Sequence, residues 1–278
     1  MTVKVGFIGL GRMGLPMASN LVAAGFDVAV YDVRDEPQQK LVQLGAAVAP
    51  SPREVANSAE IIELAVVDDP QVEKVMLGAD GVLAGARPGS IIAIHSTIGP
   101  KTIMELAQLA EKQSVQILDA QVSGGELGAQ QKQLCYMVGG QKAAVESCRP
   151  VFSTSGSNIF HVGGLGSGAK AKMILQVVVC INMLAAGEAE RLCDASEVDF
   201  HALQQIIRVS SAQGFVFDHW LDRFKCPGDP MPIRQRRTDV FRKSLVPALE
   251  LAQQKGLSLP GAALALKRLG WAMGVETE

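Results

Sequence analysis

The chain has 278 residues, of which 48% are hydrophobic and 19% are charged, and this composition is typical of a globular protein with room for two domains. Its net charge of −2 gives no reason to expect binding to nucleic acid or to an acidic membrane surface. Residues 1–4 lack the basic region and apolar stretch that open a secretory signal peptide. We therefore expect a cytoplasmic protein with no nucleic-acid or membrane partner.

The cysteines and histidines show no spacing that is typical of a bound metal ion. The five cysteines are scattered without pairs, which favours reduced thiols over disulfides. No two histidines have the sequence spacing that is typical of metal ligands, so we expect no metal site. His95 and His161 are interpreted as structural or surface residues. The apolar run Val177–Ala186 is interrupted by Asn182 and is too short and too polar to cross a bilayer.

Short apolar runs alternate with helical stretches in the first part of the chain. Strands are predicted at Lys4–Ile8, Val28–Tyr31, Ile61–Val66, Ser90–Ile94, Gln116–Leu118, Leu134–Val138 and Asn158–His161. Helices are predicted at Met13–Ala24, Glu36–Leu44, Lys101–Lys112 and Gln141–Phe152. Strands that alternate with helices and are apolar on both faces indicate an α/β fold with a doubly wound parallel sheet, the Rossmann architecture.

The pattern changes in the glycine-rich segment 163–168, after which no strand is predicted. Helices are predicted at Ala169–Leu192, Phe200–Val209, Arg242–Gln254 and Gly261–Met273. The segment Lys225–Arg234 contains three prolines and a glycine and is predicted to be a loop. The first of these helices is long and apolar all round, which predicts that it is buried. We expect a Rossmann domain over residues 1–163 and an all-α domain for substrate binding and dimerisation over residues 164–278, with the long helix between them.

A glycine-rich motif directly follows the first predicted strand and directly precedes a predicted helix. Its residues are Gly9, Leu10, Gly11, Arg12, Met13 and Gly14, which match G-x-G-x-x-G. The first glycine permits a tight turn, the second allows a pyrophosphate to approach the backbone, and the third allows close packing of helix and strand. The N-terminus of the helix would supply free N–H groups to the phosphates. A turn without a ligand is the alternative, and the strand and helix around the motif disfavour it.

Asp32 lies at the end of the second predicted strand. A carboxylate at this point accepts hydrogen bonds from the ribose hydroxyls of NAD and repels the 2′-phosphate of NADP. Arg34, two residues later, is able to pair with that phosphate instead. The sequence therefore favours NAD as the cofactor and leaves NADP possible.

Three further segments carry polar residues and glycines that the fold itself does not require. Residues 95–100 follow a buried strand, at the sheet edge where ligands bind in such folds. Residues 119–125 also follow a predicted strand, and Ser123 with its two glycines offers a hydroxyl and N–H groups suited to a carboxylate. Residues 166–172 open the long apolar helix and end at Lys172.

Taken in order, these motifs resemble those of the β-hydroxyacid dehydrogenases. The resemblance is carried by residues 6–21, by residues 119–125 together with 137–140, and by the glycine-rich turn that leads to Lys172. The family includes 3-hydroxyisobutyrate dehydrogenase and 2-hydroxy-3-oxopropionate reductase, with 6-phosphogluconate dehydrogenase as a larger relative. The resemblance covers essentially the whole chain. It implies an NAD(P)-dependent enzyme that interconverts a small β-hydroxyacid and its semialdehyde or keto acid, and that forms a homodimer or homotetramer.

The resemblance also implies roles for individual residues. Lys172 matches the catalytic lysine, which exchanges a proton with the substrate hydroxyl while hydride is transferred; Lys170 is its competitor, and the register against the glycines favours Lys172. The positions matching cofactor contacts are Val66, Val67, Thr97 and Lys243. The positions matching substrate contacts are Ser123, Gly124, Gly125 and Gln176.

The sequence departs from the family at several of these positions. Gln176 stands where the family usually has an asparagine, one helical turn after Lys172, and Ser244 replaces an aspartate that usually follows the late lysine. These changes leave the identity of the acid open. An imine reductase and a non-catalytic dinucleotide-binding scaffold are the alternatives, and both generally lack the lysine that is present here.

Overall fold

The computed structural model describes residues 3–277, so Met1 and Thr2, at the start of the segment considered as a signal peptide, lie outside the described residues. The chain divides into two compact units, Met1–Lys172 and Met173–Glu278. The division falls within helix α9 (Ser167–Ala195), which begins in the first unit and continues in the second. The predicted boundary after residue 163 lies shortly before this helix.

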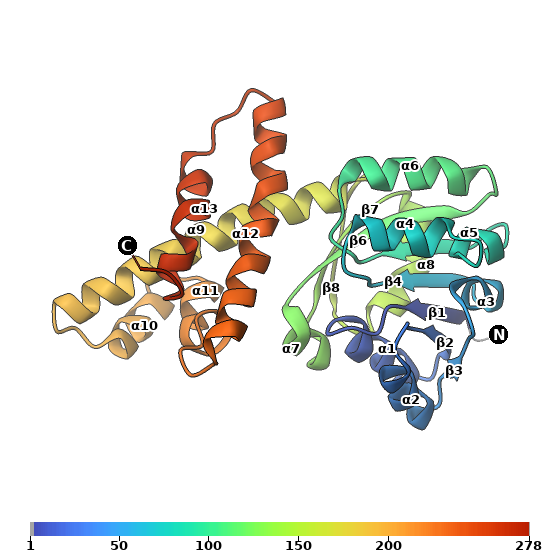
Figure 1. Ribbon diagram of the computed structural model, residues 1–278, viewed down its shortest axis with the longest axis horizontal. Coiled ribbons are helices and arrows are strands. Elements are labelled where there is room, and N and C mark those ends of the chain that lie inside the picture. The colour runs from blue at the N-terminus through green and yellow to red at the C-terminus, as the bar shows by residue number, and fades with distance from the viewer. Residues whose placement is uncertain (1–2, 278) are drawn as a thin grey trace. The chain divides into compact units, whose positions relative to one another are not determined.

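The first unit contains one eight-stranded sheet with the strand order β3-β2-β1-β4-β5-β6-β7-β8 (Figure 1). The strands are β1 (Lys4–Ile8), β2 (Asp27–Tyr31), β3 (Ala47–Val48), β4 (Ile61–Leu64), β5 (Ile91–Ile94), β6 (Gln116–Ser123), β7 (Cys135–Gly139) and β8 (Asn158–Gly163). Neighbouring strands are parallel except for β6 and β7. The predicted Rossmann architecture is therefore confirmed, with one antiparallel pair that the sequence did not indicate.

Strand β6 is longer than predicted. It was expected to end at Leu118, with the polar segment from Asp119 following it, but it continues to Ser123. Its second half pairs antiparallel with β7, in a register that runs from Asp119 opposite Gly139 to Ser123 opposite Cys135. The polar residues in this half concealed the strand, because buried strands were recognised by continuous apolar runs.

Helices cover both faces of the sheet. They are α1 (Gly14–Ala23), α2 (Asp35–Leu44), α3 (Pro52–Ser58), α4 (Asp69–Leu77), α5 (Val82–Gly85), α6 (Pro100–Glu111), α7 (Gly125–Gln130) and α8 (Lys142–Phe152). Residues of α1, α2 and α8 pack in the core on one face, and residues of α3 to α6 pack in the core on the other (Figure 1).

The helices α3, α4, α5 and α7 were not predicted, and three of them, α3, α5 and α7, have seven residues or fewer. Two of them nevertheless begin with a local signal. The side chains of Ser51 and Asp68 accept hydrogen bonds from the backbone N–H of Glu54 and Gln71, and each of these helices has a proline in its first turn. A capping residue followed by proline is a recognised start signal for a helix.

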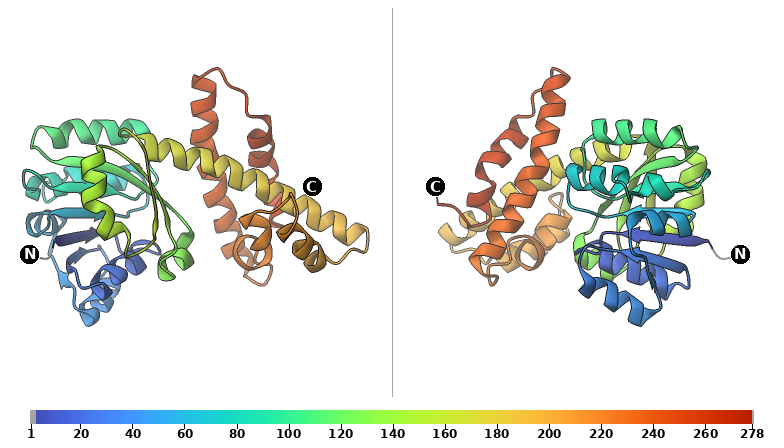
Figure 2. Two further views of the ribbon diagram at one scale, coloured as in Figure 1. Left: turned by 180° about the vertical axis from the view of Figure 1, so that it is seen from behind. Right: turned by 45° about the vertical axis from the view of Figure 1, so that its right-hand side comes forward.

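The second unit is all-helical over its described residues. It contains the rest of α9, α10 (Phe200–Arg208), α11 (Phe215–Asp218), the π-helix η1 (Trp220–Phe224), α12 (Met231–Gln254) and α13 (Pro260–Ala272). Its core is built around the fully buried Trp220, and α12 and α13 form a hairpin (Figure 2). Helix α12 contains the predicted helix Arg242–Gln254 but begins at Met231, so the predicted loop was wrong over residues 231–234. Pro232 lies in the first turn, where its missing N–H costs nothing.

Helix α9 corrects two expectations. It has 29 residues and its most apolar stretch has a mean hydropathy of 1.5, so by length and composition it could cross a membrane, contrary to the expectation from its apolar run. Part of it packs in the core of the helical unit through Cys180, Met183 and Ala186. It is not buried on all sides, however: the exposed fractions are 63% for Ile174, 51% for Val178 and 67% for Leu192.

Candidate functional site

The carboxyl ends of five neighbouring parallel strands, β2, β1, β4, β5 and β6, lie at one edge of the sheet. The strand order reverses between β1 and β4, and ligands of open α/β sheets bind outside the carboxyl ends at such a point. The structure brings most of the predicted site residues to this edge: Gly9 to Gly14 after β1, Asp32 after β2, Val66 and Val67 after β4, Thr97 after β5, and Ser123 to Gly125 at the end of β6.

The glycine turn has the geometry that the motif predicts. Gly9 has a φ of +93°, and a Cβ on it would lie 2.6 Å from the carbonyl oxygen of Ala65. A Cβ on Gly14 would lie 1.8 Å from the carbonyl oxygen of Gly9, so neither position accepts a side chain. At Gly11 a Cβ would meet nothing within 4 Å, which leaves the backbone open to a ligand. These residues fit a dinucleotide whose pyrophosphate lies at the N-terminus of α1.

Asp32 is buried beside this turn. Its Oδ2 accepts a hydrogen bond of 2.6 Å from the backbone N–H of Leu10, and its Oδ1 accepts 2.9 and 3.0 Å bonds from the backbone N–H and the Nε of Arg34. The Arg34 guanidinium also donates to the carbonyl oxygen of Leu10 over 3.0 Å. Burial alone would raise the pKa of Asp32, but these hydrogen bonds outweigh it and the pKa is lowered. A carboxylate is therefore held at the place where the ribose is expected.

The segment after β5 is held by its neighbours on both sides. The hydroxyl of Ser96 accepts a hydrogen bond of 2.9 Å from the backbone N–H of Val66. Gln121 of β6 donates from its side-chain amide to the carbonyl oxygen of Ser96 over 2.9 Å. Thr97 itself is exposed, as is Val67. The two predicted cofactor contacts are therefore accessible on two neighbouring segments, after β4 and after β5, that are joined by the hydrogen bond between Val66 and Ser96.

Lys172 lies in the second turn of α9 and reaches the end of β6. Its Nζ donates a hydrogen bond of 2.9 Å to the carbonyl oxygen of Val122, the residue directly before Ser123. Cys135 lies opposite Ser123 in the β6–β7 register. Burial raises the pKa of the Cys135 thiol, and the positive charge of Lys172 opposes this change. The structure thus places a lysine ammonium beside the segment predicted to bind a carboxylate, whereas Lys170 is exposed.

Asp119 opens the candidate segment 119–125, but the sequence pattern predicted no role for its side chain. Its side chain is fully buried, and its two carboxylate oxygens accept hydrogen bonds of 2.8 Å from the backbone N–H groups of Gly166 and Ala169. It therefore caps the N-terminus of α9, the helix that carries Lys172. Burial raises the pKa of Asp119 more than these hydrogen bonds lower it. The available signal was an acidic residue within an apolar run.

The segment predicted to bind substrate, Ser123 to Gly125, is linked to the glycine turn by an ion pair of the residue that follows it. After β6 the chain turns through Gly124 and Gly125, with φ values of +130° and +64°. Glu126, which follows, accepts a hydrogen bond of 2.8 Å from the Nε of Arg12 in the glycine motif. A groove of about 350 Å³ lies beside this pair, lined by Gly11, Arg12, Leu15, Pro16, Ser19, Asn20, Glu126 and Gln130.

Two predicted site residues belong to the helical unit. Gln176 lies on α9 and is partly buried, and Lys243 lies on α12 and is exposed. Arg242, beside Lys243, pairs with both carboxylate oxygens of Glu276 at 2.5 and 2.6 Å. The proposed contacts of Gln176 with substrate and of Lys243 with cofactor stay predictions.

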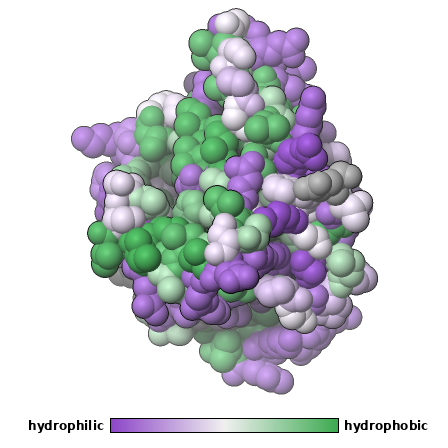
Figure 3. Space-filling view, turned by 90° about the vertical axis from the view of Figure 1, so that its left-hand side faces the viewer, coloured by the Kyte–Doolittle hydropathy of each residue, from purple (hydrophilic) through white to green (hydrophobic). Residues whose placement is uncertain are grey.

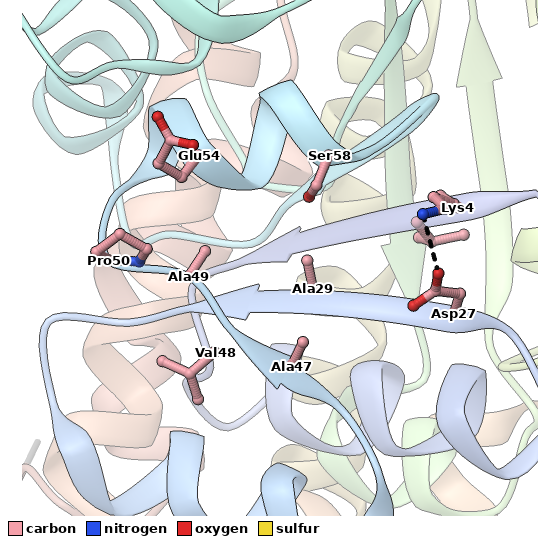
Figure 4. A pocket seen from close by; sticks show the side chains of 10 residues that line it. Lys4, Asp27, Ala29, Ala47, Val48, Ala49, Pro50, Glu54 and Ser58 are labelled. Atoms are coloured by element: carbon pink, nitrogen blue, oxygen red, sulfur yellow. Dashed lines mark ion pairs between the residues drawn. The ribbon is translucent and has the colours of Figure 1, made fainter.

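A second pocket of about 350 Å³ lies elsewhere in the first unit (Figure 4). It is lined mainly by small side chains of β2, β3 and α3, and Lys4 and Asp27 at its rim form an ion pair of 3.4 Å. These two residues begin β1 and β2, whereas Gly9 and Asp32 follow the ends of the same strands. The pocket is therefore distinct from the predicted dinucleotide site. Over residues 3–277 no group of three or more His, Cys, Asp or Glu side chains could hold a metal ion.

Comparison with known proteins agrees with this geometry. Residues 4–163 match the NAD binding domain of 6-phosphogluconate dehydrogenase, and residues 166–273 match the family described as NAD-binding of NADP-dependent 3-hydroxyisobutyrate dehydrogenase. The chain is 33% identical to the 2-(hydroxymethyl)glutarate dehydrogenase of Eubacterium barkeri, over 100% of this chain and 92% of that protein. It is 34% identical to the NAD-dependent L-serine dehydrogenase of Pseudomonas aeruginosa, over 95% and 90%.

A solved structure extends this likeness to three dimensions. The 3-hydroxyisobutyrate dehydrogenase of Mycobacterium tuberculosis, solved with L-serine, superposes with a TM-score of 0.82 at 27% identity and covers 99% of this chain and 98% of that one. Both sequence matches and this superposition extend over both units. The chain therefore belongs to the β-hydroxyacid dehydrogenase family of NAD(P)-dependent oxidoreductases.

Proposed function

We propose that this protein oxidises a small β-hydroxyacid with NAD, or reduces the corresponding semialdehyde with NADH, and that Lys172 is the general acid/base. The observation that carries the proposal is the hydrogen bond between the Nζ of Lys172 and the carbonyl oxygen of Val122. It holds the amine beside Ser123, Gly124 and Gly125, the segment proposed to bind the substrate carboxylate, at the sheet edge where the dinucleotide binds.

The proposed chemistry requires three things of the chain. The hydroxyl and N–H groups of Ser123, Gly124 and Gly125 bind the carboxylate and fix the distance from it to the carbinol carbon. Lys172, as the neutral amine, takes the hydroxyl proton while a hydride leaves the carbinol carbon, and it returns a proton in the reverse direction. The nicotinamide, when bound, accepts or supplies that hydride. One alcohol is oxidised for each nicotinamide reduced, and one proton is released.

The names of the relatives narrow the substrate class. L-serine, 3-hydroxyisobutyrate and 2-(hydroxymethyl)glutarate all have a hydroxymethyl group on the carbon next to a carboxylate, and they differ in the third substituent of that carbon. We propose the same core for the substrate of this protein. Gln176 would lie toward the variable substituent, because the usual asparagine is replaced by a longer amide and the space for substrate changes accordingly.

We propose NAD as the preferred nucleotide. The carboxylate of Asp32 is kept ionised by Leu10 and Arg34, and a carboxylate at this position binds the ribose hydroxyls and disfavours a 2′-phosphate. Arg34 is already engaged with Asp32 and with the carbonyl oxygen of Leu10. It would have to leave both partners to bind the phosphate of NADP.

We also propose a homodimer or homotetramer in the cytoplasm. Figure 3 shows apolar side chains gathered in patches on one face of the molecule. The exposed large apolar residues of the helical unit include Ile174, Val178, Leu192, Ile206, Val209, Phe215, Val240 and Leu264. Apolar patches of this kind commonly mark protein interfaces. Sedimentation velocity would test the assembly, and a monomer at micromolar concentration would contradict it.

The experiment that tests the function is a spectrophotometric screen for NADH formation. NAD or NADP would be offered with 3-hydroxyisobutyrate, 3-hydroxypropionate, L-serine, glycerate, threonate and 2-(hydroxymethyl)glutarate. We expect turnover with at least one acid that carries the hydroxymethyl group. No turnover with any acid, despite tight NAD binding, would contradict the proposal and favour an imine reductase or a binding scaffold.

Lys172→Met and Lys170→Met form the matched pair that tests the catalytic assignment. We expect Lys172→Met to lower kcat by roughly 10²–10⁴-fold while the Kd for NAD stays unchanged. Lys170→Met removes the same charge from the same helix, two residues earlier and on an exposed side chain, and should leave kcat unchanged. Normal turnover in Lys172→Met would contradict the role of Lys172.

A further inference from the structure

Glu63 and His95 are polar side chains buried in the core of the Rossmann unit. Glu63 lies in β4, opposite Phe7 of β1 and Ala93 of β5, and is 2% exposed. His95 directly follows β5 and is 5% exposed. Burying such groups is costly unless each has a hydrogen-bond partner. Neither residue is used by the chemistry proposed above, so their presence in the core requires a separate reason.

The two side chains form a hydrogen-bonded chain across three neighbouring strands. The Nε2 of His95 lies 3.1 Å from the Oε1 of Glu63, and the Nδ1 of His95 lies 2.7 Å from the carbonyl oxygen of Ala120. A carbonyl oxygen only accepts, so Nδ1 carries a proton and donates it. The chain therefore links β4, β5 and β6, which are adjacent in the sheet (Figure 1).

Aromatic rings surround the imidazole. Its centroid lies 6.4 Å from that of Phe7, 5.9 Å from that of Tyr136 and 5.8 Å from that of Phe152. The titratable groups that face Glu63 from other elements are Tyr136 of β7 and Cys148 of α8. Burial and, secondly, the negative charge of Glu63 raise the pKa of both groups. Both are uncharged at neutral pH, so the imidazole is the group that pairs with the carboxylate.

The residues that adjoin the hydrogen-bonded series of Glu63, His95 and Ala120 are those of the proposed site. His95 is followed by Ser96, which is bonded to the backbone of Val66, and then by Thr97. On β6, Ala120 is followed two residues later by Val122, whose carbonyl oxygen accepts the hydrogen bond of Lys172. Gln121 of β6 also donates to the carbonyl oxygens of Ile94 and Ser96. The His95 ring connects these two strands to the side chain of Glu63 on β4, so a shift of the ring would move groups on all three strands.

We propose that Glu63 and His95 are positioning residues, which hold the carboxyl ends of β4, β5 and β6 together. They thereby fix the distance between Thr97, which follows β5, and Lys172. This inference rests on the proposed function, because it assumes that these two groups lie on either side of the reacting carbon. Since NAD is bound at its adenosine end by residues after β1 and β2, the pair should affect kcat and leave the binding of NAD unchanged. Misplacement of reacting groups by about 1 Å costs up to roughly 100-fold in rate.

The main variant is the double substitution Glu63→Leu/His95→Leu. Replacing both partners of a buried pair with apolar side chains of similar volume is often neutral for stability, whereas removing one partner leaves an unpaired group. We expect a melting temperature within about 4 °C of the wild type, an unchanged Kd for NAD, and a kcat 10- to 100-fold lower by the argument above. Cys148→Ala, which perturbs the same core and leaves both members of the pair in place, is the matched control and should keep the wild-type kcat.

A folded double variant with normal kcat would overturn the proposal. This includes a variant whose only change is weaker NAD binding, seen as a higher Kd. Should the double variant not fold, Glu63→Gln and Glu63→Leu form a second pair: the amide of the first can donate to the Nε2 of His95 and should keep kcat, whereas the second removes the hydrogen bond and should lower kcat. Equal kcat values in these two variants would overturn the proposal.

A second readout needs no substrate. In ¹⁵N–¹H spectra of the NAD-bound protein, the amide signals of Val66, Ser96 and Thr97 should shift in the double variant and stay in place in Cys148→Ala, and the wild-type His95 Nδ1 should show the chemical shift of a protonated nitrogen. Unmoved amide signals or an unprotonated Nδ1 would overturn the proposal. If instead Lys172→Met keeps its turnover, the proposed catalyst fails, and these spectra still decide whether the pair positions the segment.

Discussion

The carboxylate of Asp119 binds the first turn of the helix that carries Lys172. Its two oxygens accept hydrogen bonds of 2.8 Å from the N–H groups of Gly166 and Ala169, and Ala169 lies three positions before the lysine. Asp119 and Val122 lie on the same strand. One strand therefore fixes both the start of the helix and the Nζ of the lysine, so the position of the amine depends on two contacts with β6.

Replacement of Asp119 should consequently weaken both the fold and the activity. In Asp119→Asn one of the two acceptor oxygens becomes an NH₂ group that faces a backbone N–H. We expect the free energy of unfolding to fall by about 1–3 kcal/mol, the cost of leaving such a buried group unpaired, and kcat to fall because the lysine moves. Urea unfolding and steady-state kinetics would measure the two effects. Asp194→Asn, an exposed aspartate on the same helix, should change stability by less than about 0.5 kcal/mol.

The pH dependence of stability supplies a separate test of Asp119. Because burial raises its pKa above 3.8 in the folded protein, the folded state binds more protons than the unfolded state just above that pH. The stability that this group contributes is thus fully present below the unfolded pKa of about 3.9 and is lost as the pH rises through the folded pKa. The stability difference between wild type and Asp119→Asn should be larger at pH 4 than at pH 7. A difference that grows with pH would mean that the pKa is lowered instead.

Asp32 should control the choice between NAD and NADP. In Asp32→Ser the carboxylate is lost, so the ribose loses an acceptor, the repulsion of a 2′-phosphate disappears, and Arg34 is released to bind it. We expect the ratio of kcat/KM for NADP to that for NAD to rise at least 10-fold. Asp27→Ser, at the opposite end of the same strand, should leave the ratio unchanged. If Asp32→Ser lowers kcat/KM by the same factor for NAD and for NADP, Asp32 only stabilises the glycine turn.

The features that local sequence patterns encode were the ones that could be predicted. Buried parallel strands are continuous apolar runs. The turn between β1 and α1 requires glycine at position 9 for its positive φ and at position 14 because a Cβ there would meet the carbonyl oxygen of Gly9, and both reasons act within a few residues. The strands β1, β2, β4 and β5, the glycine motif and the start of α9 were accordingly placed to within a few residues.

The contacts that build the rest of the site join residues far apart in the chain. Lys172 and Val122 are 50 residues apart, and His95 and Glu63 are 32 apart. No periodicity relates such pairs, so the sequence showed the lysine but not its acceptor, and it showed an isolated histidine where the fold forms a chain across three strands. The second half of β6 was missed for the same reason, because its polar residues form hydrogen bonds with partners at the start of α9 and after β5.

The ion pair between Arg12 and Glu126 should compete with the binding of NAD. Arg12 lies in the glycine motif, and its guanidinium pairs with Glu126 over 2.8 Å with side chains that are 84% and 38% exposed. A pyrophosphate at the N-terminus of α1 would attract the same guanidinium. Exposed pairs contribute at most about 1 kcal/mol, so Glu126→Gln should tighten NAD binding by no more than about 5-fold, and added salt should reduce the effect.

A double-mutant cycle separates this competition from the simple loss of a negative charge near the phosphates. If Glu126 acts through Arg12, Glu126→Gln should have a smaller effect on the Kd for NAD in the Arg12→Ala background than in the wild type. Glu146→Gln, which breaks an exposed ion pair with Arg149 on α8, should leave the Kd unchanged in both backgrounds. Equal effects of Glu126→Gln in the two backgrounds would show that Arg12 does not move toward the nucleotide, and the link between the glycine turn and the substrate segment would then be structural only.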